Sequence, residues 1–363
     1  MISGLAKFAG GLETVVNELA ESLTSRGHQV TVYGRYKEDF VEQNGLLRTV
    51  GVCPSELLPR RLRFAHYDKY AYNLKVWKKT LRDGSFDVIH GHGDNCFFSA
   101  LLRDTTPLIA TFHLTQIGCF HVLHEQKIGP RAFPVFIPEM TAAHRSDIVV
   151  ACSKAVKGEL VGGYKVNPNK VRLIYNGVNT KVFRPLDKQH ARKALGLPLD
   201  KRYLLWVGTN PKPKRLNTAI ETAKSMDNTC LLIAGVPGVT RGCTVYFGQI
   251  NDSSRMRVLY SAADVLVFPT AYEGFGLTAI ESMACGTPAI VSRFAPVTEL
   301  FERSLATLVA TSLDAAEYRE KANWLLSDRS SYEALSVEGR KLAERLTWER
   351  QAREYWKLYE SLT

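Results

Sequence analysis

The hydrophobic positions of this chain form short apolar runs that alternate with amphipathic stretches of helical period. Residues 265–268 are an unbroken apolar run that Pro269 stops, and residues 289–291 form a second run. Both are short, bounded and rich in β-branched residues, which is typical of buried strands. Between them, the apolar positions of residues 277–284 recur at helical spacing, and Gly286 is a suitable C-terminal stop. A strand, a loop, a helix and a strand in this order predict the crossover unit of a parallel sheet.

The same alternation continues on both sides of this unit. Further strands are predicted at 30–33, 86–92, 107–112, 147–151, 170–175, 202–207, 229–234, 244–247 and 306–310. Helices are predicted at 12–26 and 216–226, within 312–345, and at 348–362. Strands that alternate with helices along the chain predict an α/β fold with parallel sheets. The 363 residues are enough for two domains, each with a core of its own.

Composition and net charge limit the kinds of molecule that this protein is expected to bind. The net charge of +11 favours nucleic acid, an anionic membrane surface or phosphorylated substrates. No segment resembles a nucleic-acid-binding module, so no nucleic-acid partner is expected. The seven cysteines are scattered and form no CxxC, which argues against a disulfide framework and a zinc site. The sequence shows no secretory signal and no apolar run as long as a membrane span, so a cytoplasmic location is expected.

Residues 57–82 combine many basic side chains with large aromatic ones. A basic helix of this kind can lie on an anionic membrane surface, which would place the protein peripherally at the inner membrane face. A solvated helix with a buried apolar stripe explains the same pattern, and both interpretations stay open. The basic residues are Arg60, Arg61, Arg63, Lys69, Lys75, Lys78, Lys79 and Arg82.

The loop before the helix at 277–284 carries the most specific chemistry. It reads Glu273-Gly274-Phe275-Gly276, and its glycines allow the backbone to approach a ligand closely. The first amides of a helix have no internal partners and the dipole is positive there, so the place suits an anion such as a diphosphate. Two carboxylates lie beside such a site, those of Glu273 and Glu281, and they would repel an anion that carried no hydroxyl groups. They are suited to hold sugar hydroxyls, which donate hydrogen bonds to ionised carboxylates.

The string EGFGLTAIESMACGTP resembles the donor-binding motif of the retaining family-4 glycosyltransferases of GT-B fold, in which seven residues separate two glutamates. The resemblance implies that Glu281 holds the ribose hydroxyls of a nucleotide sugar and that Glu273 binds sugar hydroxyls. It also implies that the backbone amides of Phe275, Gly276 and Leu277 contact the sugar and the phosphates.

The resemblance extends to the first half of the chain. Gly10, Gly11 and Glu13 match a G-G-x-E loop, which in the family faces the cleft near the donor phosphates and the acceptor. Residues 87–92 look like the family's D-V-x-H-x-H. His113 fills the family's T-x-H position, whose histidine contacts the donor sugar, and it is predicted to orient that sugar.

A basic turn follows Gly208. In the family an arginine comes next and a lysine five positions later, and both pair with the donor diphosphate. Thr209 replaces the arginine here, whereas Lys214 matches the lysine. Lys212 or Arg215 is near enough to supply the missing charge. The turn follows a predicted strand and opens a predicted helix, which favours phosphate contact.

The family's fold implies two Rossmann-like, doubly wound domains that face each other across a cleft. We expect an acceptor-binding domain at 1–184, a domain for the nucleotide sugar at 185–346, and a last helix, 347–363, that crosses back to the first domain. The implied reaction transfers a hexose from a UDP- or GDP-type donor to an acceptor hydroxyl, with retention of configuration. No cofactor is expected. The sequence contains no D-x-D motif, so no metal site is predicted.

Three alternatives stay open: a relative that epimerises or phosphorolyses sugars, a catalytically weak partner subunit, and a Rossmann oxidoreductase. The last would need a G-x-G-x-x-G after a strand, which this chain lacks. The acceptor could be a glycan, a lipid carrier or a small molecule.

The first strand is where the sequence departs furthest from the family. At most residues 1–3 stand in its place, although the first strand of a doubly wound sheet is central. Buried backbone groups that lack a partner are costly, so we expect the natural start to lie upstream of Met1.

Overall fold

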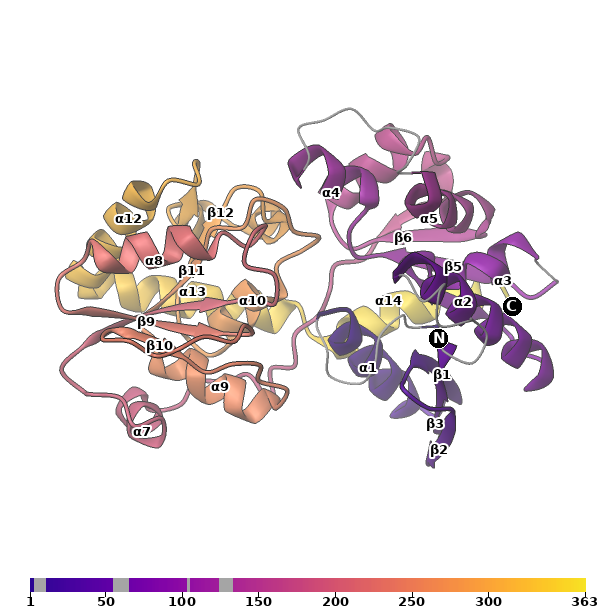
Figure 1. Cartoon of the computed structure of the whole chain (residues 1–363), viewed down its shortest axis with the longest axis horizontal. Helices are drawn as coiled ribbons and strands as arrows, with labels where there is room; N and C mark the ends of the chain where they lie inside the picture. The colour runs from indigo at the N-terminus through magenta and orange to yellow at the C-terminus, as the bar shows by residue number, and fades with distance from the viewer. Residues whose placement is uncertain (3–10, 55–64, 103–104, 124–132) are drawn as a thin grey trace. The chain divides into compact units, whose positions relative to one another are not determined.

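The computed structural model describes residues 1–2, 11–54, 65–102, 105–123 and 133–363 (Figure 1). The chain divides into two compact units. One comprises Met1–Asn176 and Trp348–Thr363, and the other comprises Gly177–Thr347. The prediction placed the first boundary later, after residue 184.

The first unit is built on parallel strands with one antiparallel hairpin. Its strands are β1 (Val30–Arg35), β2 (Phe40–Asn44), β3 (Leu47–Val52), β4 (Ile89–His92), β5 (Leu108–Phe112), β6 (Ile148–Ala151) and β7 (Val171–Leu173). They lie in the orders β1-β3-β2 and β4-β5-β6-β7. The β2–β3 pair is antiparallel, and the other neighbouring strands are parallel.

Ile2 occupies the position between β1 and β4, where the central strand was expected. It forms parallel bridges to Tyr33 on one side and to Gly91 on the other. The Ile2 amide donates to the His90 carbonyl oxygen at 2.8 Å, and the Ile2 carbonyl oxygen accepts from the His92 amide at 3.1 Å. Its side chain is buried. Ile2 therefore pairs with a strand on each side and joins the two groups of strands.

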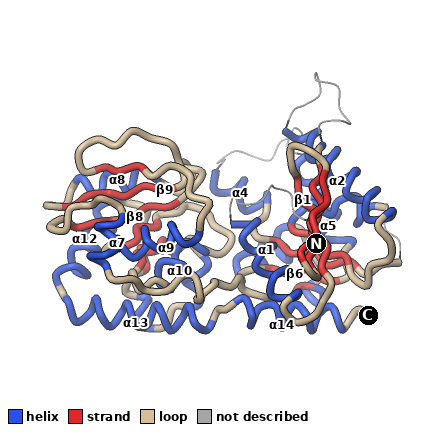
Figure 2. The backbone as a smooth tube through the Cα atoms, turned by 90° about the horizontal axis from the view of Figure 1, so that it is seen from below, coloured by secondary structure: helices blue, strands red, loops and turns tan. Residues whose placement is uncertain are grey.

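The helices of the first unit cover these strands. They are α1 (Gly11–Thr24), α2 (Ala65–Arg82), α3 (Phe97–Leu101), α4 (Gln116–Leu123), α5 (Phe133–Arg145), α6 (Lys154–Gly158) and α14 (Trp348–Glu360). The C-terminal α14 lies beside the strands of this unit (Figure 2). Its residues Ala352 and Tyr355 share one apolar cluster with Leu19 of α1 and Ile109 of β5.

The second unit is a parallel sheet with helices on both faces. Its strands are β8 (Arg202–Val207), β9 (Thr229–Ala234), β10 (Thr244–Tyr246), β11 (Val265–Phe268), β12 (Ala289–Ser292) and β13 (Val309–Ala310). Its helices are α7 (Lys188–Ala194), α8 (Leu216–Lys224), α9 (Ser253–Ala262), α10 (Leu277–Ala284), α11 (Arg303–Ala306), α12 (Ala315–Ser327) and α13 (Arg329–Arg345). Figure 1 shows α8 and α12 on one side of the sheet and α9 on the other.

The strand order β10-β9-β8-β11-β12-β13 defines where this sheet can bind a ligand. From β8 the chain winds outward through β9 to β10, and then returns to place β11 on the other side of β8. In open α/β sheets, ligands bind beyond the carboxyl ends of the strands at such a reversal. The favoured place is therefore formed by the loops that follow β8 and β11.

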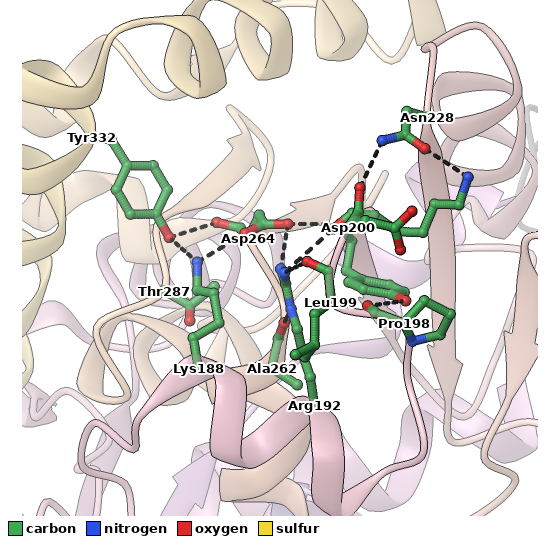
Figure 3. Close-up of polar contacts among 12 residues, drawn as sticks. Lys188, Arg192, Pro198, Leu199, Asp200, Asn228, Ala262, Asp264, Thr287 and Tyr332 are labelled. Atoms are coloured by element: carbon green, nitrogen blue, oxygen red, sulfur yellow. Dashed lines mark hydrogen bonds and ion pairs between the residues drawn. The ribbon is translucent and has the colours of Figure 1, made fainter.

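Asp264 lies at the other end of the strands, where its side chain forms a cluster of polar contacts (Figure 3). Its carboxylate accepts hydrogen bonds from Arg192 at 2.7 Å, from Lys188 at 2.9 Å and from the amide of Tyr203 at 2.7 Å. The Tyr332 hydroxyl donates to the Asp264 carbonyl oxygen at 2.9 Å. Asp264 directly precedes β11, so this cluster lies at the amino ends of the strands. It ties α7 and α13 to the sheet at the end away from the loops that follow β8 and β11.

Candidate active site

Lys214 and Glu273 meet at the reversal in strand order. Lys214 lies in the loop after β8, Glu273 lies in the loop after β11, and their side chains form an ion pair. Each side chain is about one-fifth exposed (22% and 20%). The Lys214 ammonium also lies 5.0 Å from the centroid of the Phe268 ring, which ends β11. The structure thus brings two predicted site residues together at a partly desolvated edge.

Backbone contacts hold the two loops against each other. The Ala271 amide donates to the Pro213 carbonyl oxygen at 2.8 Å, and the Trp206 indole donates to the Lys214 carbonyl oxygen at 2.9 Å. Trp206 is fully buried in β8. The position of Lys214 is therefore set by the core of the sheet.

Gly276 is required by the shape of the loop that enters α10. Its φ is +118°, and a Cβ there would lie 3.0 Å from Val297 Cγ1. The neighbouring Phe275 is buried, and its carbonyl oxygen accepts a hydrogen bond from the Val297 amide at 2.7 Å. The loop is thus pinned from one side, and the positive end of α10 begins at Leu277.

Glu281 lies one turn into α10 and is held by Tyr260 of α9. The Tyr260 hydroxyl donates to Glu281 Oε2 at 2.8 Å, and the Tyr260 side chain is fully buried. Glu281 itself is half-buried. A carboxylate fixed on one side by a buried phenol keeps acceptor capacity for ligand hydroxyls.

The other basic residues of the turn differ from Lys214. Lys212 and Arg215 are exposed. Arg215 has a left-handed backbone conformation (φ 52°) and directly precedes α8. Both cations remain at the surface, and Lys214 is the residue of this turn that pairs with Glu273.

His113 follows β5 in the first unit and contacts His92. His92 ends β4, the parallel neighbour of β5, and its Nδ1 lies 2.9 Å from His113 Nε2. Burial lowers the pKa of His113 to about 4 and lowers the pKa of His92 well below its usual value. Both imidazoles are therefore neutral at pH 7. His113 therefore does not carry a positive charge toward a phosphate.

A third histidine extends this cluster. His90 stacks on His92 with ring centroids 4.4 Å apart. Its two nitrogens lie 2.7 Å from the Tyr359 hydroxyl and 2.7 Å from the Thr111 hydroxyl. The sequence identified 87–92 only as part of a motif. The contact between His92 and His113 depends on strand register, which the sequence did not reveal.

The glycine loop of the first unit is described only in part. Gly10 lies outside the described residues, and Gly11 is the first residue of α1. Glu13 is buried, and burial raises its pKa. No described residue forms a hydrogen bond with its carboxylate oxygens.

The basic segment at 57–82 is described from Ala65 onward, as α2, and residues 57–64 lie outside the described residues. Tyr72 and Val76 of α2 are fully buried. Lys75 donates to the Cys53 carbonyl oxygen at 2.7 Å, and Lys69 pairs with Asp94 at 2.5 Å. The described part is thus an amphipathic helix with a core stripe. No helix in the described ranges is sufficiently long and apolar to span a bilayer.

The sequence did not predict a recess beside α2. The Lys69–Asp94 pair forms part of its wall, together with Tyr70, Asn73, Phe97, Val135 and Pro138. Charged, polar and aromatic groups thus meet in one hollow of the first unit. In the sequence, Lys69 is one basic residue among many, and no motif marks Asp94.

Comparison with known proteins defines the class. The profile of Glycosyltransferase Family 4 matches residues 9–182, and that of Glycosyl transferases group 1 matches residues 187–342. The two matches and the α/β architecture define a glycosyltransferase of GT-B fold. The chain belongs to the family-4 glycosyltransferases, as the E-G-F-G motif indicated.

Individual relatives agree with this assignment. The chain is 29% identical to a D-inositol 3-phosphate glycosyltransferase of Acidothermus cellulolyticus, over 85% of this chain and 76% of that protein. It is 26% identical to a glycosyltransferase of Methanocaldococcus jannaschii, over 97% and 95% of the two chains.

Solved structures share the fold. Sucrose-phosphate synthase from Thermosynechococcus elongatus has a TM-score of 0.84 at 24% identity, with 99% and 98% of the two chains covered. Anabaena HepE in complex with UDP and glucose has a TM-score of 0.75 at 15% identity, with 99% of each chain covered.

Proposed function

We propose that this glycosyltransferase transfers a hexose from a UDP- or GDP-type nucleotide sugar to an acceptor hydroxyl, with retention of configuration. The observation that carries the proposal is the Lys214–Glu273 pair at the strand reversal of the second unit. A cation there suits a diphosphate, and a carboxylate there suits sugar hydroxyls. The UDP and glucose found with the Anabaena protein support a UDP-sugar as the first donor to test.

Each residue has a defined role in the proposal. Lys214 neutralises the negative charge that develops on the leaving diphosphate, which is a large electrostatic demand of the step. The amides at the start of α10 bind the same phosphates. Glu281 accepts hydrogen bonds from the ribose hydroxyls, and Glu273 accepts them from the sugar. His113, as a neutral imidazole, orients the sugar.

The ion pair also explains how this place can be stable before a donor binds. Without a donor, Lys214 and Glu273 neutralise each other in a partly desolvated place, where an unpaired charge would be costly. A bound donor would offer phosphate oxygens to Lys214 and hydroxyls to Glu273. Each of the two side chains would then exchange its ion-pair partner for a polar group of the ligand.

For the acceptor, we propose a hydroxyl of a small phosphorylated polyol or sugar. The names of the relatives, D-inositol 3-phosphate glycosyltransferase and sucrose-phosphate synthase, support this class. The net charge of +11 is compatible with an anionic acceptor. A peripheral contact with an anionic membrane through residues 57–82 remains a proposal that rests on their composition.

The test is a transfer assay with a panel of UDP- and GDP-sugars and of free and phosphorylated polyols. We expect turnover with one donor class and a product that keeps the anomeric configuration of the donor. Turnover with inversion would refute retention. Binding of a donor without any transfer or hydrolysis would favour a catalytically weak partner subunit, to which the loss of arginine at Thr209 already points.

A further inference from the structure

Cys230 and Cys243 lie side by side at the amino ends of two neighbouring strands in the second unit. β9 and β10 pair in parallel with Leu231 opposite Thr244, so Cys230 is opposite Cys243. The Leu231 amide donates to the Cys243 carbonyl oxygen at 2.7 Å, which extends the pairing to the residue before β10. Side chains at opposite positions of paired strands lie on the same face of the sheet. The strand register therefore brings the two thiols together.

The spacing of the two cysteines suits a covalent bond. Both are free, and the Cys243 thiol lies within hydrogen-bonding distance of the Cys230 thiol. Neighbouring strands lie about 4.8 Å apart, and the Cα atoms of disulfide-bonded cysteines lie about 4.4–6.8 Å apart. A disulfide between these residues thus fits the paired strands as they stand.

The two thiols differ in their surroundings. Cys230 is buried, and Tyr203 of β8 lies opposite it on the side away from Cys243. The Arg192 guanidinium covers the Tyr203 ring, 4.8 Å from its centroid. Burial, together with the neighbouring Cys243, raises the pKa of Cys230 to about 12. Cys243 is exposed in the turn before β10. A reagent in solution therefore reaches Cys243 first, and Cys230 reacts with what Cys243 carries.

We propose that Cys230 and Cys243 are a modification site at which a reversible disulfide forms. The oxidant is a low-molecular-weight disulfide. The Cys243 thiolate attacks one of its sulfur atoms and expels one thiol, which leaves a mixed disulfide on Cys243. Cys230 then loses its proton and attacks the Cys243 sulfur, which expels the second thiol. The two protein thiols are thereby oxidised to one disulfide, and the oxidant is reduced to two thiols.

The bond would clamp an edge strand beside the candidate active site. β10 has three residues and lies at the end of the sheet, where it pairs with β9. The segment that the bond closes, residues 230–243, includes Gly235. A Cβ on Gly235 would lie 2.4 Å from the Gly208 carbonyl oxygen, and Gly208 begins the loop that carries Lys214. Oxidation would thus fasten a segment that packs against the start of this loop.

Peptide mapping tests the bond itself. The unaltered protein is equilibrated in buffers of reduced and oxidised glutathione, the remaining thiols are blocked, and the peptides are identified by mass spectrometry. We expect a pair of peptides linked through Cys230 and Cys243, and dithiothreitol should separate them. A glutathione that persists on Cys243, or a bond from Cys243 to another cysteine, would overturn the proposal. Two free thiols in the most oxidising buffer would also overturn it.

Melting curves test the clamp. The oxidised form should melt about 6–12 °C above the reduced form, the shift that closing a loop of this length gives in a unit of this size. Both forms are the same protein, so this comparison needs no substitution. A linked peptide without a higher Tm would overturn the clamp.

Two serine variants show whether the shift belongs to this pair. Cys243 is exposed, so Cys243→Ser should fold normally, give no linked peptide and melt at one temperature in all the buffers. Cys119→Ser keeps the pair and is the control for the loss of a cysteine elsewhere, so it should retain both the linked peptide and the rise in Tm. A rise that persists in Cys243→Ser, or that disappears in Cys119→Ser, would contradict the assignment.

Discussion

Lys214 and Glu273, 59 positions apart in the sequence, form an ion pair because the strands that precede them are neighbours in one sheet. β8 and β11 pair in parallel, with Leu204 opposite Val265, so the loops after both strands emerge at the same edge. The pair joins the residue proposed to bind the donor phosphates to the residue proposed to bind the sugar. Sheet topology therefore determines the chemistry of this edge.

Replacement of Lys214 should impair catalysis more than it impairs binding. Lys214→Met keeps the length of the side chain and removes the charge that opposes the charge of the leaving diphosphate. We expect kcat to fall by about 10²–10³, the loss seen when one electrostatic stabiliser of a transition state is removed. Steady-state kinetics with the preferred donor would measure it. Lys224→Met, at an exposed lysine of α8, is the matched control. Equal losses in both variants would contradict a specific role of Lys214.

Chelation should leave transfer nearly unchanged. In the proposed function, protein cations and helix amides neutralise the donor diphosphate, so no divalent ion is needed for that purpose. The measurement is the initial rate before and after dialysis against EDTA. A complete loss that Mn²⁺ or Mg²⁺ restores would show that this part of the proposal is wrong.

Loss of Asp264 should destabilise the second unit without changing the loops at the carboxyl ends of its strands. Arg192 and Lys188 would keep their charges but lose the carboxylate that both contact. Removing one partner of a buried ion pair typically costs about 3–5 kcal/mol. Chemical denaturation of Asp264→Ala would show this loss, whereas the affinity of the folded protein for the donor should not change. A weaker affinity at full folding would place Asp264 in the functional site.

Glu139 should make stability depend on pH. It is buried on α5 and accepts hydrogen bonds from the Tyr164 hydroxyl and, at 2.7 Å, from the Gln116 amide. Burial raises its pKa to about 7 in spite of these bonds. A raised carboxyl pKa means that the folded state binds the proton more tightly than the unfolded state does. The resulting stabilisation is fully present below the unfolded pKa, and it is lost as the pH rises through about 7.

The variant Glu139→Gln isolates this effect. Its amide can accept the same hydrogen bonds and does not titrate, so its melting temperature should fall less than that of the unaltered protein between pH 5 and about 8. Melting curves of both proteins across that range would measure the difference. Parallel curves would show that Glu139 does not titrate there.

The sequence predicted the second unit well because its signals are local. The run at 265–268 is β11, and the predicted helix at 277–284 is α10. Gly276 also follows from local geometry, because its positive φ leaves few other residues possible. The family motif fell on the edge that the strand order marks independently for ligand binding.

The first unit was harder to predict because its features depend on contacts between distant segments. The His92–His113 contact follows from the pairing of β4 with β5, and no local pattern encodes that register. The β2–β3 hairpin could have been predicted, since Asn44-Gly45 is a strong turn signal between strands. The pairing of Ile2 on both sides depends on two strands that follow far along the chain.

Calorimetric titration of UDP- and GDP-sugars into the unaltered protein and into Glu281→Gln tests the central claim most directly. The claim is that the carboxyl edge of β8 and β11, with α10, binds a nucleotide sugar. We expect one donor class to bind and Glu281→Gln to weaken it by about 1.5–3 kcal/mol, because ribose hydroxyls lose a charged acceptor. Glu221→Gln, at an exposed position on α8, should bind as the unaltered protein does. An affinity that Glu281→Gln leaves unchanged, or a protein that binds none of these donors, would contradict the claim.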